Sequence, residues 1–216
     1  MAAWAVAVVA AAGPVAPTHD VRAAAPPGRP NVLLLPMDDA RTGQTFAMPK
    51  ALAWLSDNGK LFGEHGLPEK FMPYLQAERV PLPISWPGHI PAGSDRRLAA
   101  NLDITPTVLA AAGLTPSFQV DGRDLLAPGD RRALLTEYWR DPANGAGIPS
   151  WASTVVPGRY RYTEIYDDAF TVTDREYYDL ARDPWQLTNP LQDGSTRPAL
   201  AAALARQRTC TGRDCP

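Results

Sequence analysis

The sequence predicts an α/β fold followed by a small antiparallel sheet with a terminal helix. Residues 31–36 (NVLLLP) form a short continuous apolar run, which is typical of a strand buried on both faces in a parallel sheet. Residues 101–113 (NLDITPTVLAAAG) carry the start and stop signals of a helix. From residue 131 onward, short strand-like segments alternate with turns, as in an antiparallel sheet.

Short-range sequence features predict the helix over residues 101–113 and the elements that follow it. Asp103 or Thr105 can cap this helix, Pro106 suits its first turn, and Gly113 suits the position after its last turn. Four strand-like segments then follow, at residues 133–138, 151–156, 160–166 and 175–180. The alanine-rich residues 198–208 predict a final helix.

The segments between the first strand and this helix are less regular. Residues 48–55 (MPKALAWL) indicate the first turns of a helix, and residues 56–59 (SDNG) end it as a turn. Residues 69–77 fit either a short helix or a loop. Residues 79–86 (RVPLPISW) look extended, and their two prolines confine them to an edge or an irregular strand.

Length and charge narrow the class of protein. A chain of 216 residues suits one domain, or one domain with a small appendage. A formal net charge of −2 gives no reason to expect nucleic acid or an anionic membrane as a partner.

The amino-terminal residues predict export. Residues 2–12 are an apolar run of the length of a signal-peptide core, too short to span a bilayer, and residues 21–25 offer a small-residue cleavage region. No Lys or Arg precedes the apolar run, so the usual basic start is missing. We expect a signal peptide over residues 1–25, a mature chain with no membrane span, and a location outside the cell or in the cell envelope.

The two cysteines support the same compartment. Cys210 and Cys215 lie five residues apart, and Gly212 between them permits a tight loop. A small disulfide fits an oxidising compartment. A zinc site would need two further ligands, and no histidine lies in the preceding hundred residues.

Two adjacent carboxylates follow the first predicted strand. Asp38 and Asp39 fall at its carboxyl end, which is the edge where ligands bind in open α/β sheets. Carboxylate oxygens are the hard ligands that Mg²⁺ and Ca²⁺ prefer. The pair therefore predicts a metal site, and the alternative is a solvated turn with an aspartate cap.

Residues 56–70 (SDNGKLFGEHGLPEK) resemble a motif of the sulfatase family, within the alkaline phosphatase superfamily. Residues 29–39 (RPNVLLLPMDD) resemble the strand that opens mature members of that family. Further similar segments follow in the family's own order: RVPLPISWPGHIPAG at 79–93, NLDITPTVLAAAGL at 101–114, DGRDLL at 121–126, GRYRYTEI at 158–165 and REYYDLARDPWQLTN at 175–189.

The resemblance implies a set of site residues. Asp38 and Asp39 correspond to one pair of metal ligands, and Asp57 and Asn58 to a second pair, for a divalent cation such as Ca²⁺ or Mg²⁺. Lys70 corresponds to the lysine that contacts the sulfate. Such a cation polarises a sulfate oxygen, and the lysine ammonium offsets the remaining charge.

The resemblance also implies an architecture. Residues 29–129 correspond to an alkaline-phosphatase-like α/β sandwich, and residues 130–216 to a small antiparallel-sheet subdomain. His65 lies within the similar motif, where an isolated histidine in a glycine-rich loop is either a metal ligand or a local hydrogen-bonding residue.

The sequence departs from the family at the nucleophile. Sulfatases use a formylglycine made from the Cys or Ser of a C-x-P-x-R or C-x-A-x-R motif. The first cysteine here is Cys210, in CTGRD, and Ser85 is followed by Trp-Pro-Gly-His with no arginine. Without a formylglycine, covalent catalysis has no attacking group.

A second departure is the spacing of the metal pairs. Only 18 positions separate Asp39 from Asp57, where the family places most of its α/β domain, so we expect the sandwich to be internally truncated. The second pair follows a strand in the family, whereas residues 51–55 here predict a helix.

Three functions follow from these observations. The first is hydrolysis of sulfate esters, on a sulfated small molecule or glycan. The second is an inactive, secreted derivative that acts as a fragment or binding module. The third is phosphate-ester hydrolysis with Thr42 or Thr45 as nucleophile. The missing motif favours sulfatase ancestry without catalysis.

Overall fold

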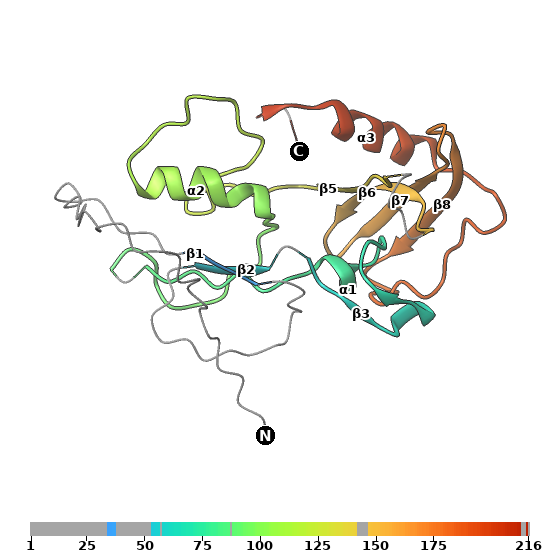
Figure 1. The fold of residues 1–216 in the computed structure, drawn as a ribbon, viewed down its shortest axis with the longest axis horizontal. Coiled ribbons are helices and arrows are strands. Elements are labelled where there is room, and N and C mark those ends of the chain that lie inside the picture. Colours follow the sequence, from blue (N-terminus) through green and yellow to red (C-terminus); the bar gives the residue numbers. More distant parts are fainter. Residues whose placement is uncertain are drawn as a thin grey trace, which may run out of the picture.

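The computed structural model describes residues 34–37, 53–56, 58–86, 88–141, 147–212 and 215. It contains a four-stranded antiparallel sheet in the order β5-β6-β7-β8, which lies at the right of Figure 1. The strands are β5 (Leu134–Tyr138), β6 (Ser150–Val156), β7 (Tyr160–Tyr166) and β8 (Val172–Asp179). The predicted antiparallel sheet is confirmed, although the strand expected at residues 175–180 begins earlier, at Val172.

One face of this sheet packs against the terminal helix. Helix α3 (Pro198–Thr209) begins with a proline at its first position, as the sequence predicts, and lies along the sheet in Figure 1. The core on this face contains the buried side chains of Ala152, Tyr162, Tyr166, Leu191 and Leu204.

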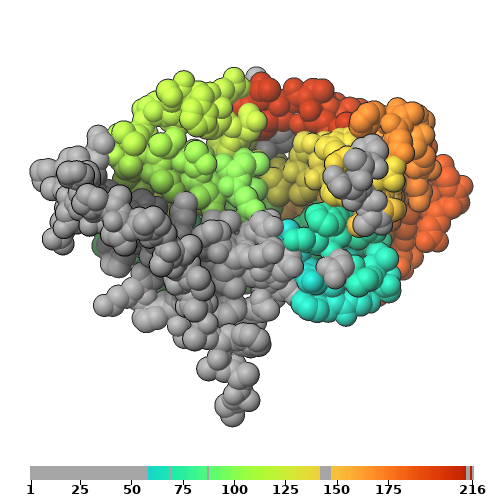
Figure 2. Space-filling model, in the orientation of Figure 1, coloured from blue at the N-terminus to red at the C-terminus, as the bar shows by residue number. Residues whose placement is uncertain are grey.

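The other face is covered by residues 58–78, part of the segment that Figure 2 shows in cyan against the yellow and orange strands. This segment contains β3 (Leu61–Phe62), the 3₁₀ turn η1 (Glu64–Gly66), β4 (Pro68–Glu69) and the single-turn helix α1 (Leu75–Glu78). Its core consists of Leu61, Tyr74, Ala77, Val155, Tyr178 and Leu180. Because side chains alternate along a strand, β6 contributes to both cores, with Ala152 in the core under α3 and Val155 in this one.

The helix predicted at residues 101–113 is present, preceded by one 3₁₀ turn. The turn η2 spans Asn101–Asp103, α2 spans Ile104–Ala111, and Gly113 adopts a left-handed φ of 66° after the helix. Asp103 is 1% exposed, and its carboxylate accepts backbone N–H groups from Ala100 at 2.8 Å and Arg123 at 2.7 Å. It also pairs with the Arg131 guanidinium. Asp103 therefore ties the helix to the chain that follows it.

The helix predicted over residues 48–55 is wrong in its described part. Residues 53–56 form strand β2 (Ala53–Ser56), which pairs in parallel with β1 (Leu34–Met37). The register aligns Leu34 with Ala53 and Met37 with Ser56, so both strands end together. A short apolar run has no periodicity that separates helix from strand, and here strand pairing decides.

The segments at residues 69–77 and 79–86 and the cysteine pair also lie among the described residues. Within residues 69–77 the short helix alternative is correct in part, since α1 begins at Leu75. Residues 79–86 form no strand, and Ile84 makes only an isolated bridge. The predicted disulfide joins Cys210 to Cys215, with Cα atoms 5.2 Å apart. In the described ranges, the helices are all too short or too polar to cross a bilayer.

Candidate functional site

Lys70 lies in the short loop between β4 and α1, where the backbone is held in an unusual conformation. The next residue, Phe71, has a φ of 73°, a left-handed conformation that is uncommon outside glycine. The Lys70 ammonium lies 5.7 Å from the centre of the Phe71 ring. A bulky residue in this conformation needs support from its surroundings.

Two aromatic side chains of the sheet supply that support. The indole N–H of Trp151, on β6, donates to the Phe71 carbonyl at 2.7 Å, and the Trp151 side chain is nearly buried, at 4% exposed. The Phe71 ring packs against Tyr138 of β5, with ring centres 5.1 Å apart. Residues 70–74, between β4 and α1, are called the lysine loop below. The carboxyl-terminal sheet thus holds this loop in place.

A buried ion pair fixes the rest of this segment to the sheet. Arg161 on β7 is 0% exposed and makes two hydrogen bonds to the Glu78 carboxylate, at 2.7 and 2.6 Å. Its guanidinium also lies 5.8 Å from the centre of the Trp151 ring. Arg161, which anchors α1 through Glu78, therefore also packs against Trp151, which holds the lysine loop.

Tyr74 and Glu176 form a polar cluster near the Arg161–Glu78 pair. The Tyr74 hydroxyl donates to Glu176 at 3.4 Å, and Tyr74 packs near Tyr178, with ring centres 6.4 Å apart. Burial raises the pKa of the Glu176 carboxyl above its ordinary value, because the charged form loses solvation. Burial likewise raises the pKa of the Tyr74 hydroxyl.

His65 lies in η1, in the same segment as Tyr74. It adopts a left-handed φ of 57° and its ring stacks on Tyr74, with ring centres 3.7 Å apart and planes 7° from parallel. Burial lowers the pKa of the imidazole below its ordinary value, which favours the neutral ring at neutral pH. Its Nε2 atom is buried and has no hydrogen-bond partner in the described part of the chain. The structure thus places His65 as a stacking partner of Tyr74.

Three of the four predicted metal ligands, Asp38, Asp39 and Asp57, lie outside the described residues. Asn58 is described, and its amide donates to the Gly59 carbonyl at 2.7 Å. No group of three or more His, Cys, Asp or Glu side chains that could hold a metal occurs among the residues that the structure describes.

The strand pairing nevertheless changes one expectation about these ligands. Asp38 follows β1 directly and Asp57 follows β2 directly, and the two parallel strands end in register. Parallel strands present their carboxyl ends at one edge of a sheet. The expectation that the second pair follows a helix is therefore wrong, and both pairs follow strands.

Sequence reasoning missed the residues that support the lysine loop. Trp151, Arg161 and Glu78 carry no motif of their own. The segment YRYT at residues 160–163 does place an arginine between tyrosines in a predicted strand, and such a charge on a strand with two packed faces needs a buried partner. That signal could have identified Arg161, but not Glu78.

We expect the Trp151→Phe substitution to loosen the lysine loop. The phenylalanine keeps most of the buried ring but removes the donor to the Phe71 carbonyl, which costs about 1 kcal/mol of stability. In ¹⁵N-resolved NMR spectra, the amides of residues 70–72 should shift and exchange faster with solvent. The matched control is Trp139→Phe, because Trp139 is a partly exposed tryptophan at the end of β5. Unchanged amides at residues 70–72 would show that the indole N–H does not hold the loop.

Comparison with known proteins connects this architecture to one family. The profile of the carboxyl-terminal region of N-sulphoglucosamine sulphohydrolase matches residues 63–209, which is more than half of the chain. The matched range includes the lysine loop, the four-stranded sheet and α3.

Individual relatives agree with this match. An N-acetylglucosamine-6-O-sulfatase of Bacteroides thetaiotaomicron is 28% identical over 148 residues, covering 64% of this chain and 26% of the relative. An arylsulfatase of Volvox carteri is 30% identical over 197 residues, covering 76% of this chain and 30% of the relative. The chain thus spans between a quarter and a third of the length of these relatives.

A solved structure shows the same fold over most of the chain. It is a protein in complex with its substrate, D-glucosamine-2-N,6-O-disulfate, and it is similar with a TM-score of 0.60 and 25% sequence identity. The similarity covers 71% of this chain and 32% of the other. Profile, relatives and fold agree, and the chain belongs to the sulfatase family of the alkaline phosphatase superfamily.

Proposed function

We propose that this protein is a secreted, non-hydrolysing sulfatase-family protein that binds a sulfated ligand at Lys70. The observation that carries the proposal is the absence of a formylglycine motif in the 216 residues. No C-x-P-x-R or C-x-A-x-R motif occurs, and the only two cysteines form a disulfide with each other. Sulfate-ester hydrolysis through a formylglycine therefore has no attacking group in this chain.

Binding, as distinct from turnover, is supported by how the lysine loop is built. Trp151 and Tyr138 hold the left-handed Phe71 next to Lys70. A supported loop presents its ammonium with little further ordering cost, which favours binding of an anionic group. The sulfated ligands of two similar proteins, a sulfated N-acetylglucosamine and a disulfated glucosamine, make a sulfated amino sugar the class to test first.

We extend the proposal to the metal and to the domains. Asp38, Asp39, Asp57 and Asn58 would bind a divalent cation, Ca²⁺ or Mg²⁺, because β1 and β2 end in register immediately before these hard oxygen ligands. When bound, the cation would polarise a sulfate oxygen of the ligand. Residues 29–129 form the truncated α/β sandwich, residues 130–216 the sheet subdomain, and residues 1–25 the export signal.

A pair of assays tests this function. Purified full-length protein with Ca²⁺ should release no sulfate from 4-nitrophenyl sulfate or from N-acetylglucosamine 6-sulfate. The second sugar should still shift the NMR signals of residues 70–72, and Lys70→Ala should remove that response. The control is Lys60→Ala, which changes another lysine of the same segment.

Two results would contradict the proposal. Sulfate release that Lys70→Ala abolishes would mean that the chain is a working sulfatase. Hydrolysis of 4-nitrophenyl phosphate, lost on substitution of Thr42 or Thr45, would instead support the phosphate-ester alternative. Titration with Ca²⁺ adds an independent check, since a cation that binds the folded state raises the melting temperature.

A further inference from the structure

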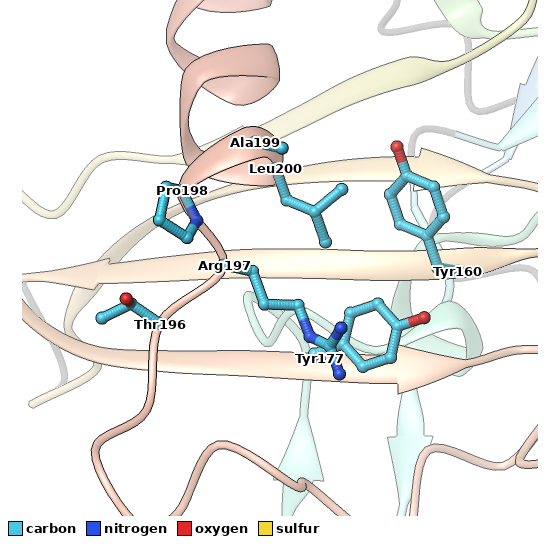
Figure 3. Close-up of a pocket in the computed structure, with 7 residues that line it drawn as sticks. All are labelled: Tyr160, Tyr177, Thr196, Arg197, Pro198, Ala199 and Leu200. Carbon is cyan, nitrogen blue, oxygen red and sulfur yellow. The ribbon is translucent and has the colours of Figure 1, made fainter.

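A cavity of about 460 Å³ lies on the sheet face opposite the lysine loop. It is formed where the chain enters α3 and passes over β7 and β8, as Figure 3 shows. Its walls include Tyr160, Tyr177, Thr196, Arg197 and Leu200. Both tyrosines pack at the margin of the core beneath α3, whereas Lys70 belongs to the segment on the other face. The cavity is therefore separate from the site at Lys70.

One arginine of the cavity, Arg197, is oriented by an aromatic ring and has no carboxylate partner among the described residues. The Arg197 guanidinium lies 4.1 Å from the centre of the Tyr177 ring and extends across it in Figure 3. Stacking fixes the plane of the guanidinium and leaves its N–H groups at the rim. Within the described ranges, Arg197 makes no ion pair, whereas Arg161 and Arg208 pair with carboxylates. An oriented and unpaired guanidinium favours an anionic group with two acceptor oxygens.

The other polar groups of the cavity are hydroxyls. The side-chain oxygens of Tyr160, Tyr177 and Thr196 form no hydrogen bond with any other described residue. Each hydroxyl can both donate and accept a hydrogen bond, which matches a ligand that itself carries several hydroxyl groups. Pro198 and Leu200 add an apolar wall. Hydroxyls, one cation and aromatic rings together indicate a polyol with an anionic substituent.

The distance between the two tyrosine rings further restricts the class of ligand that the cavity can bind. The Tyr160 and Tyr177 rings are 6.1 Å apart at an angle of 23°. A flat base inserted between two rings needs about 7 Å, two contact distances of roughly 3.5 Å, so the pair does not accommodate a nucleobase. A sugar ring can instead lie against the Tyr160 face, with its C–H groups on the electron-rich surface. A volume of 460 Å³ falls within the range of small-molecule sites, about 300–1,000 Å³.

We propose that this cavity is a second binding site, for a saccharide that carries an anionic group. Arg197 binds the anionic group, Tyr160 packs against the sugar ring, and the hydroxyls of Tyr177 and Thr196 bond to the sugar hydroxyls. The site involves no reaction. Its effect is to hold a charged glycan on the face of the sheet away from Lys70.

The test is titration of the full-length protein with three probes, followed by NMR and calorimetry. The probes are N-acetylglucosamine 6-sulfate, glucuronic acid and neutral N-acetylglucosamine. We expect the two anionic sugars to shift the signals of residues 160, 177 and 196–200, and their relative affinities to show whether sulfate or carboxylate is preferred. Arg197→Ala should weaken their binding by about tenfold or more, the usual loss for a hydrogen-bonded charge. Tyr160→Leu should weaken binding of all three sugars.

Matched variants make the outcome decisive. Arg182→Ala removes another exposed arginine that does not line the cavity, and it should leave binding unchanged. Lys70→Ala should leave the shifts at residues 196–200 in place, which separates this site from the one in the proposed function. Three results would overturn the proposal: no shifts with either anionic sugar, inorganic sulfate bound as tightly as the sulfated sugar, or Arg197→Ala and Arg182→Ala behaving alike.

Discussion

Replacing Glu78 with alanine is expected to lower the free energy of unfolding by about 3–5 kcal/mol. Glu78 supplies both acceptors for the guanidinium of Arg161, which is 0% exposed. Its removal leaves a buried positive charge without a partner, and a desolvated charge costs far more than the lost hydrogen bonds. The measurement is chemical denaturation followed by circular dichroism, with the midpoint and slope determined separately.

Two further variants test the cause of this loss. Asp95→Ala removes a surface ion pair, in which Arg97 is 36% and Asp95 is 58% exposed, and it should cost far less stability than Glu78→Ala. The double variant Glu78→Leu with Arg161→Met removes both charges, so it should be more stable than Glu78→Ala alone. If Glu78→Ala costs no more than Asp95→Ala, the buried pair does not anchor α1 to the sheet.

The Asp103→Ala substitution is expected to have a similar effect, about 3–5 kcal/mol, because it also breaks a buried ion pair. The carboxylate of Asp103 satisfies the backbone N–H groups of Ala100 and Arg123 and neutralises Arg131, whose side chain is 5% exposed. Alanine leaves all three donors without this acceptor. Thermal and urea unfolding should both show the loss.

A matched control is available in the following loop. Asp124→Ala removes a partly exposed carboxylate that accepts one N–H, from Leu126 at 2.9 Å, and should cost about 1 kcal/mol or less. Asp103→Asn keeps an acceptor but no charge, so its stability should fall between wild type and Asp103→Ala. Equal losses for Asp103→Ala and Asp124→Ala would show that Asp103 acts only as a turn residue.

The Glu78 variant also bears on the proposed function. Arg161 packs against Trp151, and Trp151 holds the Phe71 carbonyl beside Lys70. A change that releases Arg161 should therefore increase solvent exchange at the amides of residues 70–72. The lysine loop and the stability of the sheet are linked through these two buried side chains.

The elements that could be predicted are those with local signals. The strands of the antiparallel sheet, the helices α2 and α3 and the disulfide each follow from residues close together in the chain, such as Gly113 after α2. The strand β2 could not be predicted, because a run of three apolar residues before Ser56 fits a helix or a strand equally well and only pairing with β1 decides. The role of Lys70 and the metal ligands stays a prediction from the resemblance.

The amino-acid sequence by itself determined the family, the order of most elements and the lack of a formylglycine motif, since each depends on residues read in a short window. Only the tertiary structure decided what surrounds the lysine loop and what lines the cavity at the start of α3. Trp151 reaches Phe71 across 80 positions, and Arg161 reaches Glu78 across 83. Such pairs depend on which strand faces bury which side chains, and this is set by packing the whole chain.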